Sequence, residues 1–373
     1  MRVLGLMSGT SADGVDAVLA RFSGSRRRPH WQILASASVP YPERLRQQLI
    51  AAGQGACLST AELLNLAEAI TVQQAAAAQQ CDPGGLADLV GCHGQTLWHR
   101  PPANGQRGAS LQLLQGPLLA ALLQRPVVFD CRAADLALGG QGAPLVPPAD
   151  AALLGRIAGW RAVLNLGGIA NVTLIPPAQG PERNAELSGW DCGPANTLID
   201  LAVQQFSSGK RSCDEGGAWA AMGNPDEALI ASWLQQPYLQ QPPPKSTGRE
   251  LFGQADLQQR LDAMSHLGQN DQLATLTAFS AACVAQDLRE RAPVELLVAG
   301  GGCRNATLME QLRRRCRGTI VRPLAELGIA DQQREALAFA LLAWWHHHNH
   351  PGNAISVTGA RRPAVLGVCA RPA

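Results

Sequence analysis

The sequence predicts an α/β protein built from two similar halves, and three observations support this prediction. Short apolar runs typical of buried strands alternate with longer amphipathic segments typical of helices. The order of these segments in the first half recurs in the second, and each half opens on a strand, a glycine turn and a returning strand. A chain of 373 residues is also long for a single core, so two domains or lobes are expected.

The first half begins with a strand that ends near Met7, a polar tip, and a returning strand from Val15. The capping-box spacing of Ser59 and Glu62 predicts a helix that runs to about Gln80. The other elements are expected at 31–39 (strand), 89–92 (strand), 117–123 (helix) and 127–129 (strand).

The second half repeats this order. A turn at Gly167 and Gly168 joins two strands, and Pro194 occupies a position typical of a first-turn proline, which predicts a helix to about Phe206. Residues 207–268, with a proline run at 242–244, are interpreted as an insertion. The other elements are expected at 162–166, 170–175, 186–190, 296–299 and 319–321 (strands) and at 271–291, 305–315 and 331–347 (helices).

The repeat places a boundary between the halves. We expect a first lobe over residues 1–131, joined by the C-terminal segment 355–373, and a second lobe over 132–354. A cleft between two such lobes is a favoured ligand site.

Composition argues against several classes of partner. Lys and Arg number 31 against 29 Asp and Glu, and a net charge of +2 is too weak to imply nucleic acid or an anionic membrane. The ten cysteines are scattered without a Cys-x-x-Cys pair, which favours reduced thiols in a cytoplasmic protein. No apolar run reaches the ~18 residues of a membrane helix, and the polar turn at Ser8 comes too early for a signal peptide.

The tip of the first hairpin is a candidate phosphate site. Its two glycines let the backbone turn tightly and bring N–H groups near an anion, its hydroxyl residues add donors, and its two aspartates could face a magnesium ion. Turns use the same residue types for conformational reasons alone, so both interpretations stay open at this point. The segment consists of Gly9, Thr10, Ser11, Ala12, Asp13, Gly14, Val15 and Asp16.

Two further glycine clusters follow strands. Gly167 and Gly168 repeat the strand, glycine turn and strand that open the chain. Two such turns at equivalent places favour a two-sided phosphate clamp over coincidence. The third cluster follows a buried strand and precedes Asn305 at the start of a helix, where flat backbone could lie against a base or ribose. It consists of Gly300, Gly301 and Gly302.

Competing nucleotide motifs do not fit. The run Lys245-Ser246-Thr247 resembles the end of a P-loop, but Pro244 and Leu239 occupy the positions that require glycine. A dinucleotide-binding glycine motif after a strand, a protein-kinase motif set and the nucleophile elbow of hydrolases are also absent from the sequence.

Single polar residues have both a structural and a functional interpretation. His93 and Thr96 follow a buried strand and could form a sugar-binding floor, although a histidine at a strand end is more often structural. Asp191 lies between a strand and a helix start, where it could stabilise the helix dipole or act as a general base. The histidines at 346–350 fit a cationic helix end.

Several runs together resemble the anhydro-N-acetylmuramic acid kinases, and the resemblance extends through nearly the whole chain. It implies the two-lobed, duplicated actin-like (ribonuclease H-like) ATPase fold with a central nucleotide cleft. The runs are Met7–Asp16, His93–His99, Leu138–Leu145, Asn165–Asn171, Pro244–Glu250 and Ser356–Ala360.

The resemblance also implies a function. The enzyme would be a cytoplasmic ATP- and magnesium-dependent transferase of peptidoglycan recycling and amino sugar metabolism, converting 1,6-anhydro-N-acetylmuramic acid and water into N-acetylmuramic acid 6-phosphate. The phosphate-binding turn maps onto residues 9–16, with Asp13 as a magnesium ligand, and the general base onto Asp191. A homodimer is suggested. Substrate contacts are assigned to His93, Thr96, Arg132 and Asn171.

Three departures from the family pattern flank the expected sugar site. Gln115 replaces an aspartate, Ala134 an arginine and Ala195 a glycine. They keep two alternatives open: a kinase of the same fold that acts on another sugar, and a sugar or nucleotide sensor that has lost catalysis.

Overall fold

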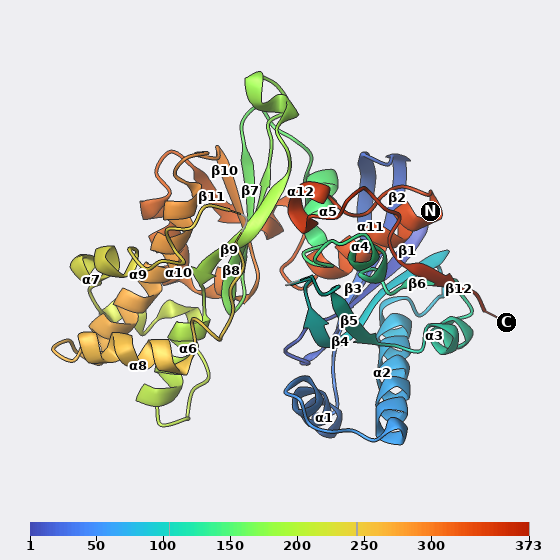
Figure 1. Cartoon of the computed structure of the whole chain (residues 1–373), viewed down its shortest axis with the longest axis horizontal. Coiled ribbons are helices and arrows are strands. Elements are labelled where there is room, and N and C mark those ends of the chain that lie inside the picture. The colour runs from blue at the N-terminus through green and yellow to red at the C-terminus, as the bar shows by residue number, and fades with distance from the viewer. Residues whose placement is uncertain (104, 244, 373) are drawn as a thin grey trace. The chain divides into compact units, whose positions relative to one another are not determined.

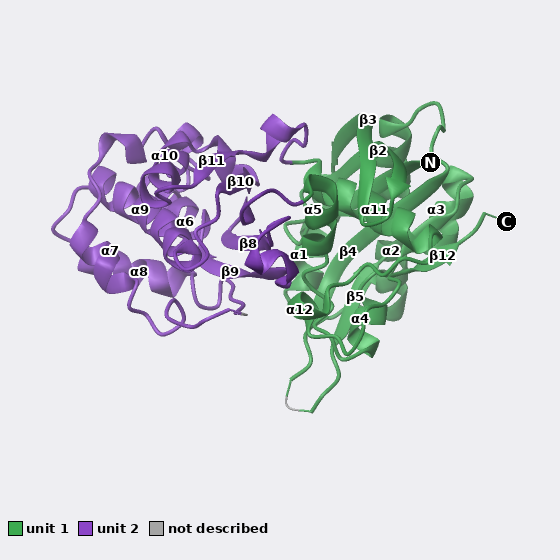
Figure 2. Ribbon diagram, turned by 90° about the horizontal axis from the view of Figure 1, so that it is seen from above, with its two compact units in different colours: residues 1–155, 332–373 green, residues 156–331 purple. Residues whose placement is uncertain are grey.

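The computed structural model describes residues 1–103, 105–243 and 245–372 (Figure 1). Pro244, which belongs to the proline run and to the 244–250 motif, lies outside the described residues. The chain divides into two compact units, unit 1 with residues 1–155 and 332–373 and unit 2 with residues 156–331 (Figure 2).

Unit 1 is built on a mixed sheet in the order β12-β6-β4-β1-β2-β3, with β5 paired to β4. β2 runs antiparallel to β1 and β3, whereas β4 runs parallel to β1 and β6. The strands are β1 (Arg2–Ser8), β2 (Gly14–Ser25), β3 (Arg28–Pro40), β4 (Leu89–Arg100), β5 (Ala109–Leu113), β6 (Val127–Phe129) and β12 (Val368–Ala370).

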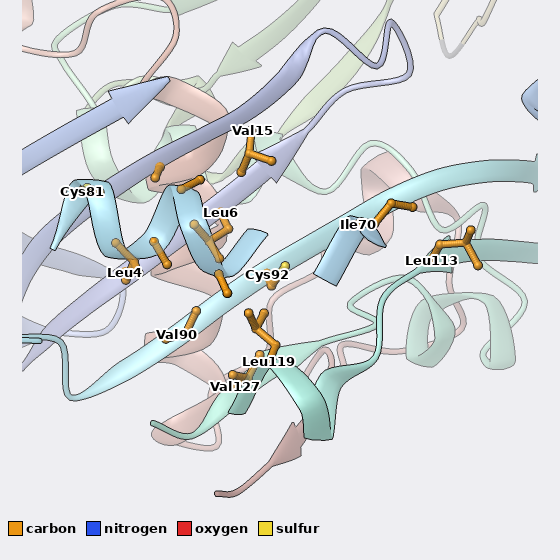
Figure 3. Close-up of a cluster of buried hydrophobic side chains, with 14 of the residues drawn as sticks. Leu4, Leu6, Val15, Ile70, Cys81, Val90, Cys92, Leu113, Leu119 and Val127 are labelled. Carbon is orange, nitrogen blue, oxygen red and sulfur yellow. The ribbon is translucent and has the colours of Figure 1, made fainter. Parts of the chain in front are cut away.

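Alternate residues of β1 meet different helices, because successive side chains of a strand point to opposite faces. Leu4 and Leu6 join Ile70 of α2 in a hydrophobic core (Figure 3). Gly5 lies against α11, where an added Cβ would come within 1.8 Å of the Ala336 carbonyl oxygen. The helices are α1 (Glu43–Gly53), α2 (Thr60–Cys81), α3 (Gly116–Leu123), α4 (Ala133–Ala137), α5 (Val146–Leu154), α11 (Arg334–His347) and α12 (Ile355–Thr358).

Unit 2 repeats this topology in the order β11-β10-β7-β8-β9. β8 is antiparallel to β7 and β9, and β10 is parallel to β7 and β11, as in the corresponding strands of unit 1. The duplicated α/β fold is thereby confirmed. The strands are β7 (Arg161–Leu166), β8 (Ile169–Ile175), β9 (Ser188–Pro194), β10 (Glu295–Ala299) and β11 (Ile320–Pro323).

The helices of unit 2 include the folded insertion. The described residues within 207–268 include α7 and α8, which share a core with α6 and α9, so these two helices are an integral part of the unit. The α-helices are α6 (Thr197–Phe206), α7 (Glu227–Trp233), α8 (Gln254–Ala263), α9 (Gln269–Leu288) and α10 (Ala306–Arg315). No helix among the described residues of either unit is long and apolar enough to cross a membrane.

The unit boundaries differ from those expected at 131/132 and 354/355. The first unit continues to Gly155 and resumes at Gln332. One reason is Asp135, whose buried carboxylate accepts hydrogen bonds from the Gly142 N–H, the Asn353 amide and the Thr358 hydroxyl. These bonds tie α4 and the 139–145 loop to the C-terminal segment within one unit.

Two local predictions need correction. β4 does not end at Cys92 but continues through His93 to Arg100, with Gly94 at φ +75° inside it. Pro194 ends β9 instead of starting a helix, and α6 begins only at Thr197. By contrast, the capping box of Ser59 and Glu62 is confirmed.

Candidate active site

The tip between β1 and β2 carries polar side chains on a backbone that is fixed by hydrogen bonds. The Gly9 carbonyl accepts hydrogen bonds from the Ala12 N–H at 3.1 Å and from the Gln95 side-chain amide at 3.0 Å. Thr10 and Ser11 are exposed, whereas the side chains of Ala12 and Val15 are buried in the core. Any ligand contact by these two residues would therefore have to come from their backbone.

Two carboxylates of this segment fit a magnesium ion that is held largely by phosphate oxygens and water. Asp13 is 71% exposed and lies 3.4 Å from Arg46, and Asp16 accepts a hydrogen bond from Ser38. Burial raises the pKa of Asp16; the Ser38 bond opposes this, and nearby Asp13 adds to it. Among the described residues no group of three or more His, Cys, Asp or Glu could hold a metal. Magnesium commonly needs only one or two carboxylates when a phosphate supplies other ligands.

His93 and Arg132 are brought together inside unit 1. The Nδ1 of His93 lies 3.1 Å from the Ser8 carbonyl and 2.9 Å from the Gly94 carbonyl, so Nδ1 carries the proton and Nε2 accepts from the Arg132 guanidinium at 2.9 Å. Burial, and then Arg132, lowers the pKa of His93 to about 3. His93 is therefore neutral and holds Arg132, whose buried Nε has no hydrogen-bond partner in the described part of the chain.

Two other polar residues of unit 1 are Thr96 and Glu335. Thr96 lies within β4 and accepts a hydrogen bond from the Gln112 amide at 3.2 Å. Glu335, in the first turn of α11, was not predicted as a functional residue. Burial raises its pKa; Arg334 and Arg132 oppose this, and Asp150 and Asp16 add to it. An acidic residue in a first helical turn suggests only a favourable helix dipole, so the sequence carried no sharper signal.

Asp191 is the central polar residue of unit 2. It lies in β9, in register with Asn171 of β8, so these two predicted residues are neighbours. Its Oδ2 accepts hydrogen bonds from the Ser246 hydroxyl and the Thr247 N–H, both at 3.0 Å. Burial raises the pKa of Asp191, while the Thr247 and Ser246 bonds oppose that rise and Glu250 reinforces it.

The second glycine turn is engaged with the start of α6. The Gly167 carbonyl accepts from the Asn196 N–H at 3.1 Å, and the Gly168 carbonyl accepts from the N–H groups of Ala195 and Thr197. Asn196 also donates its side-chain amide to the carbonyls of Leu166 and Gly167. The turn thus fixes the segment that follows β9.

The third glycine cluster follows β10, which runs parallel to β7, so it lies at the same end of the sheet as Gly167 and Gly168. Gly300 follows β10 at φ +85°, and a Cβ there would come within 2.6 Å of the Asn165 side-chain oxygen. Gly301 and Gly302 open a 3₁₀ turn. Asn305 is buried and caps α10, its side-chain oxygen accepting from the Leu308 N–H at 2.8 Å. The structure brings this cluster to the end of β7 but gives the Asn305 oxygen a structural partner.

Comparison with known proteins decides the family. The sequence model described as "Anhydro-N-acetylmuramic acid kinase" matches residues 1–372. The chain belongs to this family. Proteins of that name from Synechococcus sp. (strain CC9311) and Prochlorococcus marinus (strain MIT 9303) are each 63% identical to it, over 100% of both chains. Another from Prochlorococcus marinus (strain MIT 9211) is 53% identical over the same share.

The structure shows contacts for motifs whose role the sequence did not reveal. Ser246 and Thr247 belong to the run that resembles the end of a P-loop but lacks its glycines. Both residues donate hydrogen bonds to Asp191. The loop containing Gly142 and the turn containing Thr358 meet at Asp135. In this chain, therefore, residues of three of these runs hydrogen-bond to the carboxylates of Asp191 and Asp135.

Proposed function

We propose that this chain is an ATP-dependent kinase that hydrolyses the 1,6-anhydro ring of 1,6-anhydro-N-acetylmuramic acid and phosphorylates O6. The products would be N-acetylmuramic acid 6-phosphate and ADP. The single observation that carries the proposal, beside the family, is the Asp191 carboxylate. It is half-buried, and both of its donors in the described chain bind Oδ2, so Oδ1 is available to take a proton.

Asp191 would act as the general base. It takes a proton from water, the water oxygen attacks the anomeric carbon, and the bond between that carbon and O6 breaks. An ordinary glycosidase needs a second carboxyl group to protonate the leaving oxygen. Here O6 accepts the γ-phosphoryl group of ATP while ADP leaves, so a single carboxylate suffices. Burial raises the pKa of Asp191, which makes the ionised carboxylate a stronger base.

The phosphates of ATP are assigned to the tip of unit 1. Backbone N–H groups of residues 9–16 and the exposed hydroxyls of Thr10 and Ser11 would donate to phosphate oxygens. Asp13, with Asp16 beside it, would hold magnesium, which when bound neutralises charge that develops on the phosphate. The glycines of unit 2 at 167–168 and 300–302 are assigned to the nucleotide.

The sugar is assigned to His93, Thr96, Arg132 and Asn171. His93 would hold the Arg132 guanidinium, and the donor at Arg132 Nε suits an acidic group such as the lactyl carboxylate of the substrate. Asn171 would orient the substrate or water beside Asp191. Such an enzyme would work in the cytoplasm, where ATP is supplied, in peptidoglycan recycling, and we propose a homodimer.

Labelling tests the proposal directly. The protein is incubated with ATP, magnesium and the anhydro-sugar in ¹⁸O-water, and a 6-phosphate labelled at the anomeric oxygen is expected. A product without label would overturn the hydrolytic mechanism. Product from another sugar alone would support a different substrate, and ATP binding without product from any sugar would support a sensor.

A further inference from the structure

A buried ion pair lies close to the candidate base in unit 2. The Lys245 ammonium is 2.8 Å from the Asp287 carboxylate, and their side chains are only 1% and 7% exposed. The Lys245 ammonium also lies over the Tyr238 ring, 5.2 Å from its centre. A buried charge is tolerated only when it is paired and hydrogen-bonded, so this geometry holds Lys245 in one place.

Asp287 connects the pair to the strand that carries Asp191. It accepts a hydrogen bond from the Trp190 indole at 2.9 Å and another from the Cys192 thiol. Trp190 and Cys192 flank Asp191 in β9, and Cys192 is the extra residue of a bulge there, because Asn171 pairs with Asp191 and Ala170 with Gly193. The pair therefore holds β9 on both sides of the candidate base.

Lys245 is also joined to Asp191 through the backbone. The Asp191 N–H donates to the Lys245 carbonyl at 3.1 Å. The next two residues, Ser246 and Thr247, carry the donors to Asp191 Oδ2. Ser246 is exposed, so packing of its own side chain does not order it. The nearest firmly fixed point of this segment is the buried lysine.

We propose that the Lys245–Asp287 pair is a positioning device for the general base, which holds residues 245–247 so that their two donors bind one oxygen of Asp191. This inference rests on the proposed role of Asp191 and deepens it. It assigns a role to the Lys245-Ser246-Thr247 run, which fits no phosphate loop. Neither Lys245 nor Asp287 touches a reacting atom in this assignment.

The arrangement has an electrostatic consequence. Burial favours the neutral form of Asp191, and the hydrogen bonds from Thr247 and Ser246 favour the charged form. Releasing the segment removes these bonds and raises the pKa of the base further. Because only the ionised carboxylate accepts a proton, the acid limb of the rate profile then moves to higher pH. A pair that served stability alone would not move that limb.

The test compares pH profiles of kcat for the wild type, Lys245→Met and Ser246→Ala. We expect Lys245→Met to move the acid limb upward by about one pH unit, with about tenfold lower kcat below it, partial recovery at high pH and an unchanged KM for ATP. Ser246→Ala removes one of the two bonds and should move the limb less, in the same direction.

A matched control is available in the same unit. The Arg161–Glu295 pair is also buried, with both side chains 8% exposed, and it lies at the other end of the sheet strands from the glycine clusters. Glu295→Gln should lower the denaturation midpoint without moving the acid limb. If Lys245→Met behaves like Glu295→Gln, the pair is structural only and the proposal is overturned.

Two further outcomes keep the inference separate from the proposed function. If Asp191→Asn retains turnover, the role of Asp191 fails and this inference fails with it. If Asp191→Asn is inactive but the limb does not move in Lys245→Met, only the positioning role fails. If Lys245→Met does not fold, Ser246→Ala tests the proposal instead, because an exposed hydroxyl can be removed without unfolding the unit. An acid limb that does not move in Ser246→Ala then overturns the proposal.

Discussion

The two hairpins that open the two sheets have the same topology but different tips. β1 and β2 are joined by residues 9–13, of which Thr10, Ser11 and Asp13 are exposed. β7 and β8 are joined only by Gly167 and Gly168, whose carbonyls accept hydrogen bonds from the backbone at the start of α6. Duplication has thus kept the strand order while the tips diverged.

The difference separates two tasks. The first tip leaves two hydroxyls and the Asp13 carboxylate exposed, the latter beside Arg46, whereas the second tip is engaged in fixing the chain after β9. The second hairpin instead contributes Asn171, in register with Asp191. In the two-sided phosphate clamp expected from the sequence, the two turns would contribute unequally: the first turn would offer side chains, and the second only backbone N–H groups.

The largest effect that this comparison predicts is at Asp191. Asp191→Asn keeps the shape of the side chain and one acceptor oxygen, which can still take the two hydrogen bonds from residues 246 and 247, but its amide cannot take up a proton. Turnover should fall by about 10² to 10⁴, the usual contribution of a general base, while ATP binding by the first unit persists. Product formation and ATP titration measure the two properties separately. Near-normal turnover would mean that Asp191 is not the general base.

The sequence predicted the frame of the fold because its signals are local. The capping box of Ser59 and Glu62 and the glycine at each turn act through neighbouring residues, and these elements are found. Pro194 failed because a proline fits the last residue of an edge strand as well as a first helical turn. The strand expected at 89–92 was too short, because Gly94 adopts φ +75° inside β4 and the strand continues past it.

The candidate site was predicted only in part, since much of it depends on long-range contacts. Asp191, Asn171 and the glycine turns were identified as candidates, but the donors to Asp191 lie 55 and 56 positions further along the chain. The pairing of Arg132 with His93 spans 39 positions. Periodicity and turn chemistry carry no information about such contacts, which arise only when the sheet assembles.

The second prediction concerns His93, whose ring Nδ1 donates a hydrogen bond to the carbonyl of Ser8, the last residue of β1 before the first tip. In the folded chain the pKa of His93 is lowered from 6.5 to about 3, so between these values the unfolded chain binds more protons. The neutral histidine therefore contributes stability that is present above pH 6.5 and is lost as the pH falls toward 3. The expected slope is about 1.4 kcal/mol per pH unit.

His93→Gln should remove this slope. Denaturant unfolding between pH 4 and 7 measures it, and amide hydrogen exchange locates the change. The loss of protection on acidification should concern unit 1, because β10, which corresponds to β4, contains no histidine. An identical slope in wild type and variant would show that His93 is not the group that titrates.

The smallest effects come from a matched pair of glycine substitutions, one in each tip. At Gly9 an added Cβ meets nothing closer than the Ser11 hydroxyl at 3.7 Å, whereas at Gly168 it would lie 2.7 Å from the buried Thr197 hydroxyl. Gly168→Ala should therefore lower the free energy of unfolding by about 1–3 kcal/mol, as overpacking does. Gly9→Ala should change it by less than about 0.5 kcal/mol.

Affinity should respond in the opposite order. A methyl group at Gly9 leaves the fold intact but stands between the backbone and an approaching phosphate, so Gly9→Ala should raise the KM for ATP several-fold. Gly168→Ala should change this KM less, because its carbonyl is already committed to α6. Unfolding curves of the two variants measure the change in stability, and their rates as a function of ATP concentration measure the change in KM. Equal effects on KM would restore a symmetric clamp, since both turns would then approach the phosphates through their N–H groups.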